Sequence, residues 1–442
     1  MKMNVRDNKT SGLCCSCGIC SAVCSKGAIK YEKIKGMYVP EIDDDKCVSC
    51  GLCAELCPGF NQVYSRDNLI SPKEIAGRNV LRCYNAWSKD EYIRHISASG
   101  GVTTTIIETL LRKDKYDSVF CVDKYSCDNQ LKAVKYSYQE FANQRNNEWN
   151  TPKSRYLPVS HEDTVKYMIK NKDSRVIIVA VPCVLNSLCR IIEKYKLKRD
   201  NYLLIGLFCE RNFQYNINDY FSNLVKGKTL ISLNFKNKES GGWPGNLKLF
   251  FSDNTFSYKD KSLRTKAKSY FQPERCLYCI DKLAECADIA LGDNYTGVDS
   301  SELGSNSVII RTKIGLKAWN IVEEKLEVRH ITFKEIERAE VIDERLKNIY
   351  YSVLKRNQLK LSNLEFIKIN CGIIIDEIPC GIENQYKTML NKIDIGEKYK
   401  VKPSLYHREL KKIALKEKKK VFIYKIKVML IKIRNIIFHN CN

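Results

Sequence analysis

At 442 residues this chain is too long for one ordinary domain, and its hydrophobic share of 44% is enough for packed cores. A formal net charge of +23 suits acidic partners, but no helix-turn-helix, zinc-finger or RNA-binding motif accompanies it, so we expect no nucleic-acid partner. The sequence contains no signal peptide and no run of eighteen apolar residues. We therefore expect its 21 cysteines to work in a reducing, cytoplasmic compartment.

Two cysteine motifs come first, within residues 1–65. Each has the spacing Cys-x2-Cys-x2-Cys-x3-Cys of bacterial two-cluster ferredoxins, in which the last cysteine of each motif ligates the other cube. The spacing predicts one 4Fe-4S cluster on Cys14, Cys17, Cys20 and Cys57. It predicts a second on Cys47, Cys50, Cys53 and Cys24. Cys15 is extra, and we expect a bystander thiol there. A short hairpin is expected between the motifs, over 28–40.

The next stretch combines a strand, a small-residue loop and a helix. Residues 66–80 look like a polar linker broken at Ser71-Pro72, and a strand is expected over 83–87. The loop Ser97-Ala-Ser-Gly-Gly101 then precedes an apolar periodicity that predicts a helix over 102–112. Backbone amides at such a helix start bind anions, typically phosphate. The alternative is a plain glycine-rich connection.

Three apolar runs then predict buried strands over 118–122, 175–181 and 202–208. Helical segments alternate with them, which favours a mostly parallel sheet covered on both faces. Ligands of such sheets gather at the carboxyl ends of the strands. Cys183 and Cys209 both follow strands directly, so we expect them at that edge.

The chain changes character after residue 228. Antiparallel strands are expected over 229–235 and 247–258, and residues 315–360 have a helical pattern. Cys276-x2-Cys279 is half of a metal site, for which zinc, a thiol redox pair or an iron–sulfur cluster are alternatives. With two clusters upstream, a third cluster that adds Cys183 and Cys209 is the economical interpretation, and Cys286 is the rival fourth ligand.

The last 35 residues carry eleven Lys and Arg against two Glu. Plotted as a helix, their lysines fall on nearly opposite sides, which is not a clean amphipathic pattern. A solvated tail is the first interpretation, and contact with a membrane surface or an acidic partner is the second.

Five segments, in this order, resemble the family of coenzyme F-420 hydrogenase/dehydrogenase beta subunits. They are Ser97-Ala-Ser-Gly-Gly101, Val181-Pro-Cys183, Gly206-Leu-Phe-Cys209, Arg275-Cys-Leu-Tyr-Cys279 and Ala287-Asp-Ile-Ala-Leu-Gly-Asp293. The likeness covers roughly residues 1–320, and relatives with a fused ferredoxin also occur in bacterial polysaccharide gene clusters. One departure is Ala180-Val-Pro-Cys-Val184, where relatives commonly have Gly-Thr-Pro-Cys-Gln, so the ligand of this segment is open.

The resemblance implies FAD beside a third 4Fe-4S cluster. It implies flavin contacts at Ser99, Gly100 and Gly101, and phosphate contacts at Lys153 and Arg155. For the third cluster it favours Cys183, Cys209, Cys276 and Cys279. Asp293 could orient the flavin or a substrate, or cap a turn. No catalytic acid or base stands out.

These features predict an α/β chain (α+β overall) of four parts. They are a ferredoxin-like module (1–65), a part with the flavin loop (78–157), a mixed α/β part with the third cluster (158–325) and a helical, basic C-terminal extension (326–442). The expected function is an iron–sulfur flavoprotein oxidoreductase. It would take electrons from a carrier such as ferredoxin and reduce a small organic acceptor, either a deazaflavin-like cofactor or a polysaccharide-pathway intermediate. The alternative is a non-catalytic electron-transfer subunit that docks to a catalytic partner.

Overall fold

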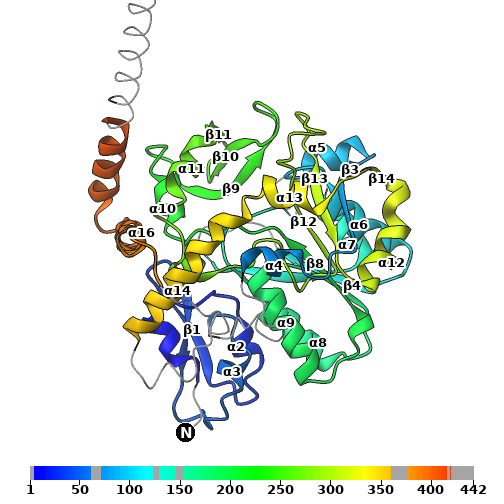
Figure 1. The fold of residues 1–442 in the computed structure, drawn as a ribbon, viewed down its shortest axis with the longest axis horizontal. Coiled ribbons are helices and arrows are strands. Elements are labelled where there is room, and N and C mark those ends of the chain that lie inside the picture. The colour runs from blue at the N-terminus through cyan, green and yellow to red at the C-terminus, as the bar shows by residue number, and fades with distance from the viewer. Residues whose placement is uncertain are drawn as a thin grey trace, which may run out of the picture.

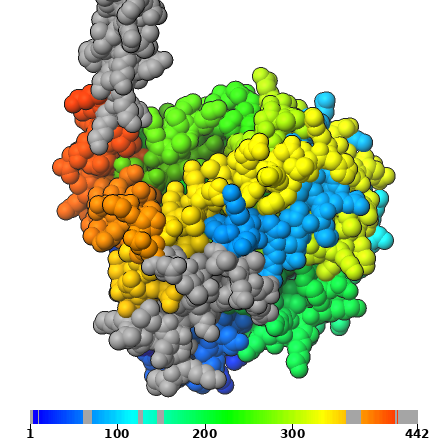
Figure 2. Space-filling model, viewed as in Figure 1, coloured from blue at the N-terminus to red at the C-terminus, as the bar shows by residue number. Residues whose placement is uncertain are grey.

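The computed structural model describes residues 4–60, 71–122, 129–145, 153–359 and 377–415, together with 419. Figure 1 shows a small N-terminal module below a large mixed α/β body, and helices of the C-terminal region along one side. In the same view, Figure 2 shows the blue N-terminal module against the green surface of residues 160–195. The predicted mixed α/β class is confirmed.

The N-terminal module is built on one β-hairpin and short helical turns. Strands β1 (Ile29–Ile34) and β2 (Met37–Ile42) pair antiparallel, as predicted. They are joined at Lys35 and Gly36, whose φ angles of 51° and 75° suit a tight hairpin turn. The short helical elements are η1 (Val5–Asp7), α1 (Asn8–Ser11), α2 (Ile19–Ala22) and α3 (Leu52–Glu55).

The two cysteine motifs adopt the same backbone. Ser16 and Ser49 occupy matching positions, with φ angles of 51° and 50°. Gly18 and Gly51 also match, with φ angles of 77° and 81°, and each is the N-cap of a short helix, α2 or α3. A positive φ at all four positions turns the chain sharply between successive cysteines. The internal repeat of the sequence is therefore a repeat in the structure.

A nine-stranded sheet forms the body, in the order β14-β3-β13-β12-β8-β7-β4-β5-β6. Its strands are β3 (Arg82–Ser88), β4 (Ser118–Val122), β5 (Leu131–Tyr136), β6 (Val159–Ser160), β7 (Val176–Ala180), β8 (Tyr202–Leu207), β12 (Ile289–Asp293), β13 (Asn306–Ile310) and β14 (Leu326–His330). The block β12-β8-β7-β4 is parallel, but β13, β3, β14 and β5 add antiparallel pairs. The prediction of a mostly parallel sheet was wrong, because half of the neighbouring pairs are antiparallel.

Helices cover both faces of this sheet, as expected. Helices α6 (Val102–Arg112) and α12 (Lys313–Val322) pack on one face with Ile177 of β7. Helices α8 (Glu162–Lys170) and α9 (Pro182–Lys194) pack on the other face with Val176 and Ile178, since successive strand side chains point to opposite faces. The core beneath helices α8 and α9 continues into the N-terminal module, so the module shares a hydrophobic core with the body.

A separate three-stranded antiparallel sheet lies beside the large one (Figure 1). It consists of β9 (Leu230–Asn237), β10 (Asn246–Phe251) and β11 (Phe256–Lys259), as predicted. Helix α10 (Ile217–Ser222) brings Tyr220 into an aromatic cluster behind this sheet, with Phe271, Tyr399 and Tyr406. This cluster ties the chain beyond helix α16 (Ile382–Glu397) to the body.

Two further expectations were wrong. Residues 71–77 are not linker: Ser71 caps helix α4 (Pro72–Gly77) in a capping box with Glu74. The helical pattern of 315–360 also hides β14, which pairs with β3. The other elements are α5 (Glu91–Ile96), α7 (Tyr138–Arg145), η3 (Arg199–Asn201), α11 (Ser262–Ala267), η4 (Glu274–Tyr278), η5 (Glu323–Lys325), α13 (Phe333–Ala339), η6 (Ile342–Arg345) and α14 (Leu346–Gln358).

The prediction for the basic tail concerns residues 408–442, most of which lie outside the described residues. Among the helices that the structure does describe, none combines the length and the apolar character needed to cross a bilayer.

Candidate functional site

One edge of the large sheet collects the predicted site residues. Strands β12, β8, β7 and β4 run parallel, and β3 runs the same way because two antiparallel steps separate it from β12. The segments that follow β3, β7 and β8 therefore start from the same edge. They carry the Ser97–Gly101 loop, Cys183 and Cys209. This is the edge where ligands of α/β sheets bind.

A cavity of about 260 Å³ opens at this edge. Four of the five residues predicted to contact the flavin line it, together with one cysteine of the third predicted cluster: Ser99, Gly101, Lys153, Arg155 and Cys209. Five lining side chains are Lys or Arg and two are Glu or Asp, so the wall carries a net positive charge. The structure thus brings the Ser97–Gly101 loop, the basic residues Lys153 and Arg155, and Cys209 to a single cavity suited to an anionic ligand.

Two glycines allow the Ser97–Gly101 loop to turn into helix α6 and to lie close against its neighbours. Gly101 caps α6 with a φ of 82°, and the amide of Val102 donates to Asn306 Oδ1 at 3.4 Å. Gly100 lies behind the cavity rather than in its lining. A Cβ on Gly100 would come within 2.9 Å of both the Ala86 carbonyl oxygen and Ser305 Cα. Glycine is needed there because the loop lies directly on β3 and the start of β13.

Polar contacts hold the same loop in place. The hydroxyl of Ser99 donates to the Ser305 carbonyl at 2.6 Å. Lys238 Nζ donates to the carbonyls of Ser99 at 3.0 Å and Leu303 at 2.8 Å, and also to that of Arg94. Burial, followed by the charges of Lys153 and Arg94, lowers the pKa of Lys238 to about 7. Lys238 is therefore a buried residue that links the Ser97–Gly101 loop to Arg94 and Leu303.

The cations of the cavity wall come from several segments. Arg155 is buried at 3% exposure, and its Nη1 donates to Asn234 Oδ1 at 3.3 Å. Lys236 of β9 pairs with Asp293 at the end of β12, and Tyr295 donates to the same carboxylate at 3.1 Å. Burial alone would raise the pKa of Asp293, but the charge of Lys236 outweighs it and keeps that pKa below its usual range. The pair is therefore ionised inside the wall.

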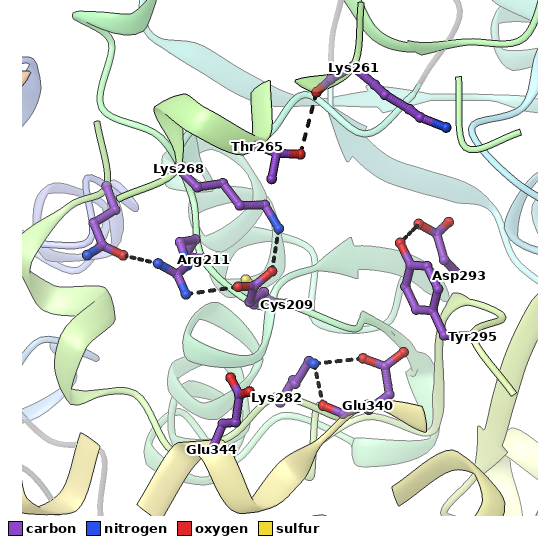
Figure 3. Close-up of polar contacts among 12 residues, drawn as sticks. Cys209, Arg211, Lys261, Thr265, Lys268, Lys282, Asp293, Tyr295, Glu340 and Glu344 are labelled. Atoms are coloured by element: carbon purple, nitrogen blue, oxygen red, sulfur yellow. Dashed lines mark hydrogen bonds and ion pairs between the residues drawn. The ribbon is translucent and has the colours of Figure 1, made fainter. Parts of the chain in front are cut away.

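A second ionic group lies next to Cys209. Figure 3 shows Arg211 and Lys268 pointing toward one carboxylate beside the Cys209 sulfur. That carboxylate is Glu210, which accepts from Arg211 at 2.8 Å and from Lys268 at 2.5 Å. Burial opposes ionisation of Glu210, but the two cations outweigh it and lower its pKa to about 2. All three residues line the cavity, so this corner keeps a net positive charge.

The four cysteines of the third predicted cluster are close to one another. Arg345 binds the carbonyls of Cys209 at 2.8 Å and Cys279 at 2.9 Å, which fixes the two segments side by side. Burial and then the neighbouring Cys276 and Cys279 raise the pKa of Cys209. Cys183 faces both Cys209 and Cys279. Such partly buried thiols ionise when a metal binds them, so the donor set fits an iron–sulfur cluster.

Cys286, the rival fourth ligand, lies elsewhere. Its nearest thiol is Cys189 of α9, whose Sγ donates to the Cys286 carbonyl at 3.7 Å. The Cys286 thiol donates to Glu285 Oε2 at 3.1 Å. Cys15 of the N-terminal module lies close enough to this group to raise the pKa of the Cys183 thiol. The sequence carries no signal for this contact, because it arises only from the docking of the module.

In the N-terminal module, Cys14, Cys17 and Cys20 all face Cys57, as the ferredoxin spacing requires. In the second motif, Cys53 lies beside Cys50, which is exposed. Cys47 accepts from Asn4 Nδ2 at 3.8 Å, and the Cys24 sulfur accepts from the Ala28 amide at 3.4 Å. No group of His, Cys, Asp or Glu within the described ranges is spaced for a single metal ion. The four cysteines of a 4Fe-4S cluster each bind a different iron, so their spacing differs from that of ligands that share one metal ion.

Sequence reasoning missed several residues of the cavity. His161 precedes α8 and lines the wall, where burial lowers its pKa to about 4 and keeps the ring neutral. Its amide donates to the Cys17 carbonyl at 2.8 Å, so the wall touches the first cluster motif. Lys236, Arg211 and Lys268 were also missed. Their place in the cavity wall becomes apparent only in the packed structure, where Lys236 meets Asp293, and Arg211 and Lys268 meet Glu210.

Comparisons with family models match three parts of the chain. Residues 83–163 match the N-terminal model of the family "Coenzyme F420 hydrogenase/dehydrogenase, beta subunit", and residues 173–338 match its C-terminal model. Residues 13–60 match a 4Fe-4S dicluster domain.

Two relatives come from methanogens. The chain is 26% identical over 379 residues to a coenzyme F420-dependent sulfite reductase of Methanocaldococcus jannaschii, and the match covers 79% of this chain but 51% of that protein. It is 24% identical to one of the subunits of the F420H2 dehydrogenase of Methanosarcina mazei, over 72% of this chain and 84% of that relative.

Among solved structures, a chain of the F420-reducing [NiFe] hydrogenase complex of Methanosarcina barkeri aligns with a TM-score of 0.47 at 18% identity. The alignment covers 66% of this chain and 97% of that one. With both family models matched in order behind the dicluster domain, this chain belongs to the family of coenzyme F420 hydrogenase/dehydrogenase beta subunits and binds iron–sulfur clusters through its N-terminal module.

Proposed function

We propose that this chain is an oxidoreductase subunit that passes electrons between a one-electron carrier protein and an anionic organic acceptor. The observation that carries the proposal is the cavity, which is lined by the Ser97–Gly101 loop, by Lys153 and Arg155, and by Cys209 at one sheet edge. When bound, 4Fe-4S clusters exchange single electrons, and FAD exchanges both single electrons and pairs.

The residues that would hold these groups follow from the placements above. Ser99, Gly100 and Gly101 shape the flavin side of the cavity, and Lys153 and Arg155 supply cations for phosphate. The first cluster would be ligated by Cys14, Cys17, Cys20 and Cys57, and the second by Cys24, Cys47, Cys50 and Cys53. A third would be ligated by Cys183, Cys209, Cys276 and Cys279. Three clusters, FAD and these ligand sets are the proposal.

The carrier protein would dock at the second cluster. Cys50 is exposed, whereas Cys17, Cys20 and Cys57 of the first set are buried. Electron transfer between proteins needs a cluster near the surface, and this part of the module supplies one. The first set lies between the second set and the body, because Cys20 faces Cys53 on one side and the Cys17 carbonyl meets His161 on the other.

The acceptor would carry negative charge. Five cations against two acids in the cavity wall favour an anion. Two relatives are named for coenzyme F420, so a deazaflavin is the acceptor we propose. The named relatives give no support to a polysaccharide-pathway acceptor.

The test is the iron, sulfide and flavin content of protein purified anaerobically. We expect about twelve irons per chain, four for each cube, and one FAD. Cys276→Ser should remove about four irons. The exposed Cys380→Ser is the matched control and should remove none.

Two outcomes would contradict the proposal. About eight irons, unchanged by Cys276→Ser, would remove the third cluster. Full iron content without flavin, and without flavin uptake on addition of FAD, would favour the non-catalytic electron-transfer subunit instead.

A further inference from the structure

One buried arginine contacts both cysteine segments of the proposed third cluster. Arg345, at 5% exposure, is the last residue of η6, which lies between α13 and α14. Its Nη1 donates to the Cys279 carbonyl at 2.9 Å, and its Nη2 donates to the carbonyls of Cys209 at 2.8 Å and Glu210 at 2.6 Å. Asn348, three residues later, donates to the same Cys279 carbonyl at 2.7 Å. A single guanidinium therefore joins the backbones of two proposed ligands.

Two ion pairs anchor the chain around this arginine. Figure 3 shows Lys282 pointing toward Glu340, and the two side chains form an ion pair at 2.9 Å. The Lys282 carbonyl also accepts from the Cys209 amide at 2.9 Å. On the other side, Lys355 of α14 pairs at 2.6 Å with Glu274 of η4, the turn that carries the first cysteine of the Cys-x2-Cys motif. The segment between α13 and α14 is thus fixed in register with the cysteines that it contacts.

A strained residue turns this segment back toward the cysteines. Val341 has a φ of 48°, in the left-handed region, where a β-branched residue is an outlier. Such a conformation persists only where the surrounding structure enforces it. Burial of the valine does not enforce it, because Val341 is 51% exposed. The buried contacts of Glu340 and Arg345, on either side of the turn, do so.

Arginine has two properties that suit this position. Its guanidinium presents several N–H donors in a rigid planar fork, and it stays positively charged in proteins. The reduced state of a cluster is one electron more negative than the oxidised state. A nearby cation therefore stabilises the reduced state and raises the reduction potential. Lysine would supply the charge without the fork, whereas glutamine would supply donors without the charge.

We propose that Arg345 is a positioning residue for the third cluster: its guanidinium holds the segments of Cys209 and Cys279 together, and its charge raises the reduction potential of that cluster. This inference rests on the third cluster of the proposed function. The match to the C-terminal family model ends at residue 338, so it assigns nothing to Arg345. No covalent bond is made or broken. The cluster accepts one electron, supplied by the carrier protein through the ferredoxin clusters, and Arg345 stays charged in both states.

The test is a redox titration of anaerobically purified holoprotein, followed by electron paramagnetic resonance, with iron measured on the same samples. The third-cluster signal is the one that Cys276→Ser abolishes. Arg345→Met removes the charge and the fork, so we expect this cluster to titrate at a more negative potential. We also expect it to lose its iron at an about tenfold lower chelator concentration. Arg345→Lys restores the charge alone and should recover most of the potential, but not the resistance to the chelator.

The controls and outcomes separate this inference from the proposed function. Arg329→Met, at an exposed arginine of β14, is the matched control and should change neither property. Arg345→Gln is a second uncharged variant if the methionine variant does not fold. A third-cluster potential unchanged in the uncharged variant, or shifted equally in Arg345→Lys, would overturn the inference and leave the third cluster standing. About eight irons in the unaltered protein would instead refute the third cluster, and the inference with it.

Discussion

Lys236 of β9 and Asp293 of β12 form an ion pair that joins the two sheets across the cavity wall. The side chains are 6% and 12% exposed, so the pair is shielded from water. Removing one partner of a buried pair leaves a charge without compensation, at a cost of about 3–5 kcal/mol, whereas removing both costs much less. The relationship is therefore a measurable link between the small sheet and the large one.

A double-mutant cycle measures this link. We expect Lys236→Met and Asp293→Leu each to lower the free energy of unfolding by about 3–5 kcal/mol, and the double variant to lose less than their sum. Urea unfolding under anaerobic conditions provides the measurement. The exposed pair Lys113–Glu324, at 41% and 61% exposure, is the control and should contribute at most about 1 kcal/mol. Additive losses in the Lys236–Asp293 cycle would show that the pair is not coupled.

The Gly100→Ala variant tests whether the proposed flavin loop, Ser97–Gly101, needs its close packing against β3 and Ser305. The new Cβ would collide with the backbone of β3 and with Ser305, so the loop must move, and we expect a loss of about 1–3 kcal/mol in stability together with reduced bound flavin. Gly77→Ala is the control, because its Cβ would meet the Phe333 ring at an ordinary 3.4 Å. Flavin retention equal to that of Gly77→Ala would show that the loop does not contact the cofactor.

Paired variants test which cysteine is the fourth ligand of the proposed third cluster. We expect Cys209→Ser to lose about four irons, because Cys209 lies with Cys276 and Cys279. Cys286→Ser should keep all of its iron, because Cys286 contacts Cys189 instead. Iron analysis after anaerobic purification distinguishes the two. Loss of iron only in Cys286→Ser would reverse the assignment.

Lys238 predicts a pH dependence of stability. Its folded pKa of about 7 lies below the ordinary 10.5, so between these values the unfolded chain binds more protons and stability rises with pH. From pH 7 to 8.5 the gain from this group is about 1.5 kcal/mol. We expect Lys238→Met to lose that gain, as measured by urea unfolding at the two pH values. An equal pH slope in both proteins would contradict the assignment.

The local parts of the fold could be predicted, and the tertiary parts could not. Helix α6 was predicted to the residue, because its apolar periodicity and the glycines before it are local signals. Ser71-Pro72 was misinterpreted as a break, although Ser at the N-cap, Pro at the first turn and Glu74 three residues on are a helix start. The strand β14 was missed because Leu326–His330 becomes a strand only by pairing with β3.

The candidate site could likewise be predicted where its signals are local in the sequence, but not where they depend on tertiary packing. The eight ferredoxin cysteines follow from spacing, and Cys183 and Cys209 were expected at strand ends. Lys236 was not expected, since it comes from the second sheet and meets Asp293 only when the two sheets pack. Nothing in the spacing of Cys15 shows that it lies close to Cys183.

The position of β3 also has a consequence for synthesis of the chain. Its two neighbours in the sheet, β13 and β14, lie more than 200 residues later. The N-terminal module emerges first from the ribosome, although it completes its hydrophobic core only with helices α8 and α9. The Ser97–Gly101 loop after β3 is different: the Ser99 hydroxyl donates to the Ser305 carbonyl, and Gly100 packs closely on Ser305 and Asn306, which the ribosome adds much later. The cysteines of the two ferredoxin motifs are therefore synthesised long before the strands that support the Ser97–Gly101 loop.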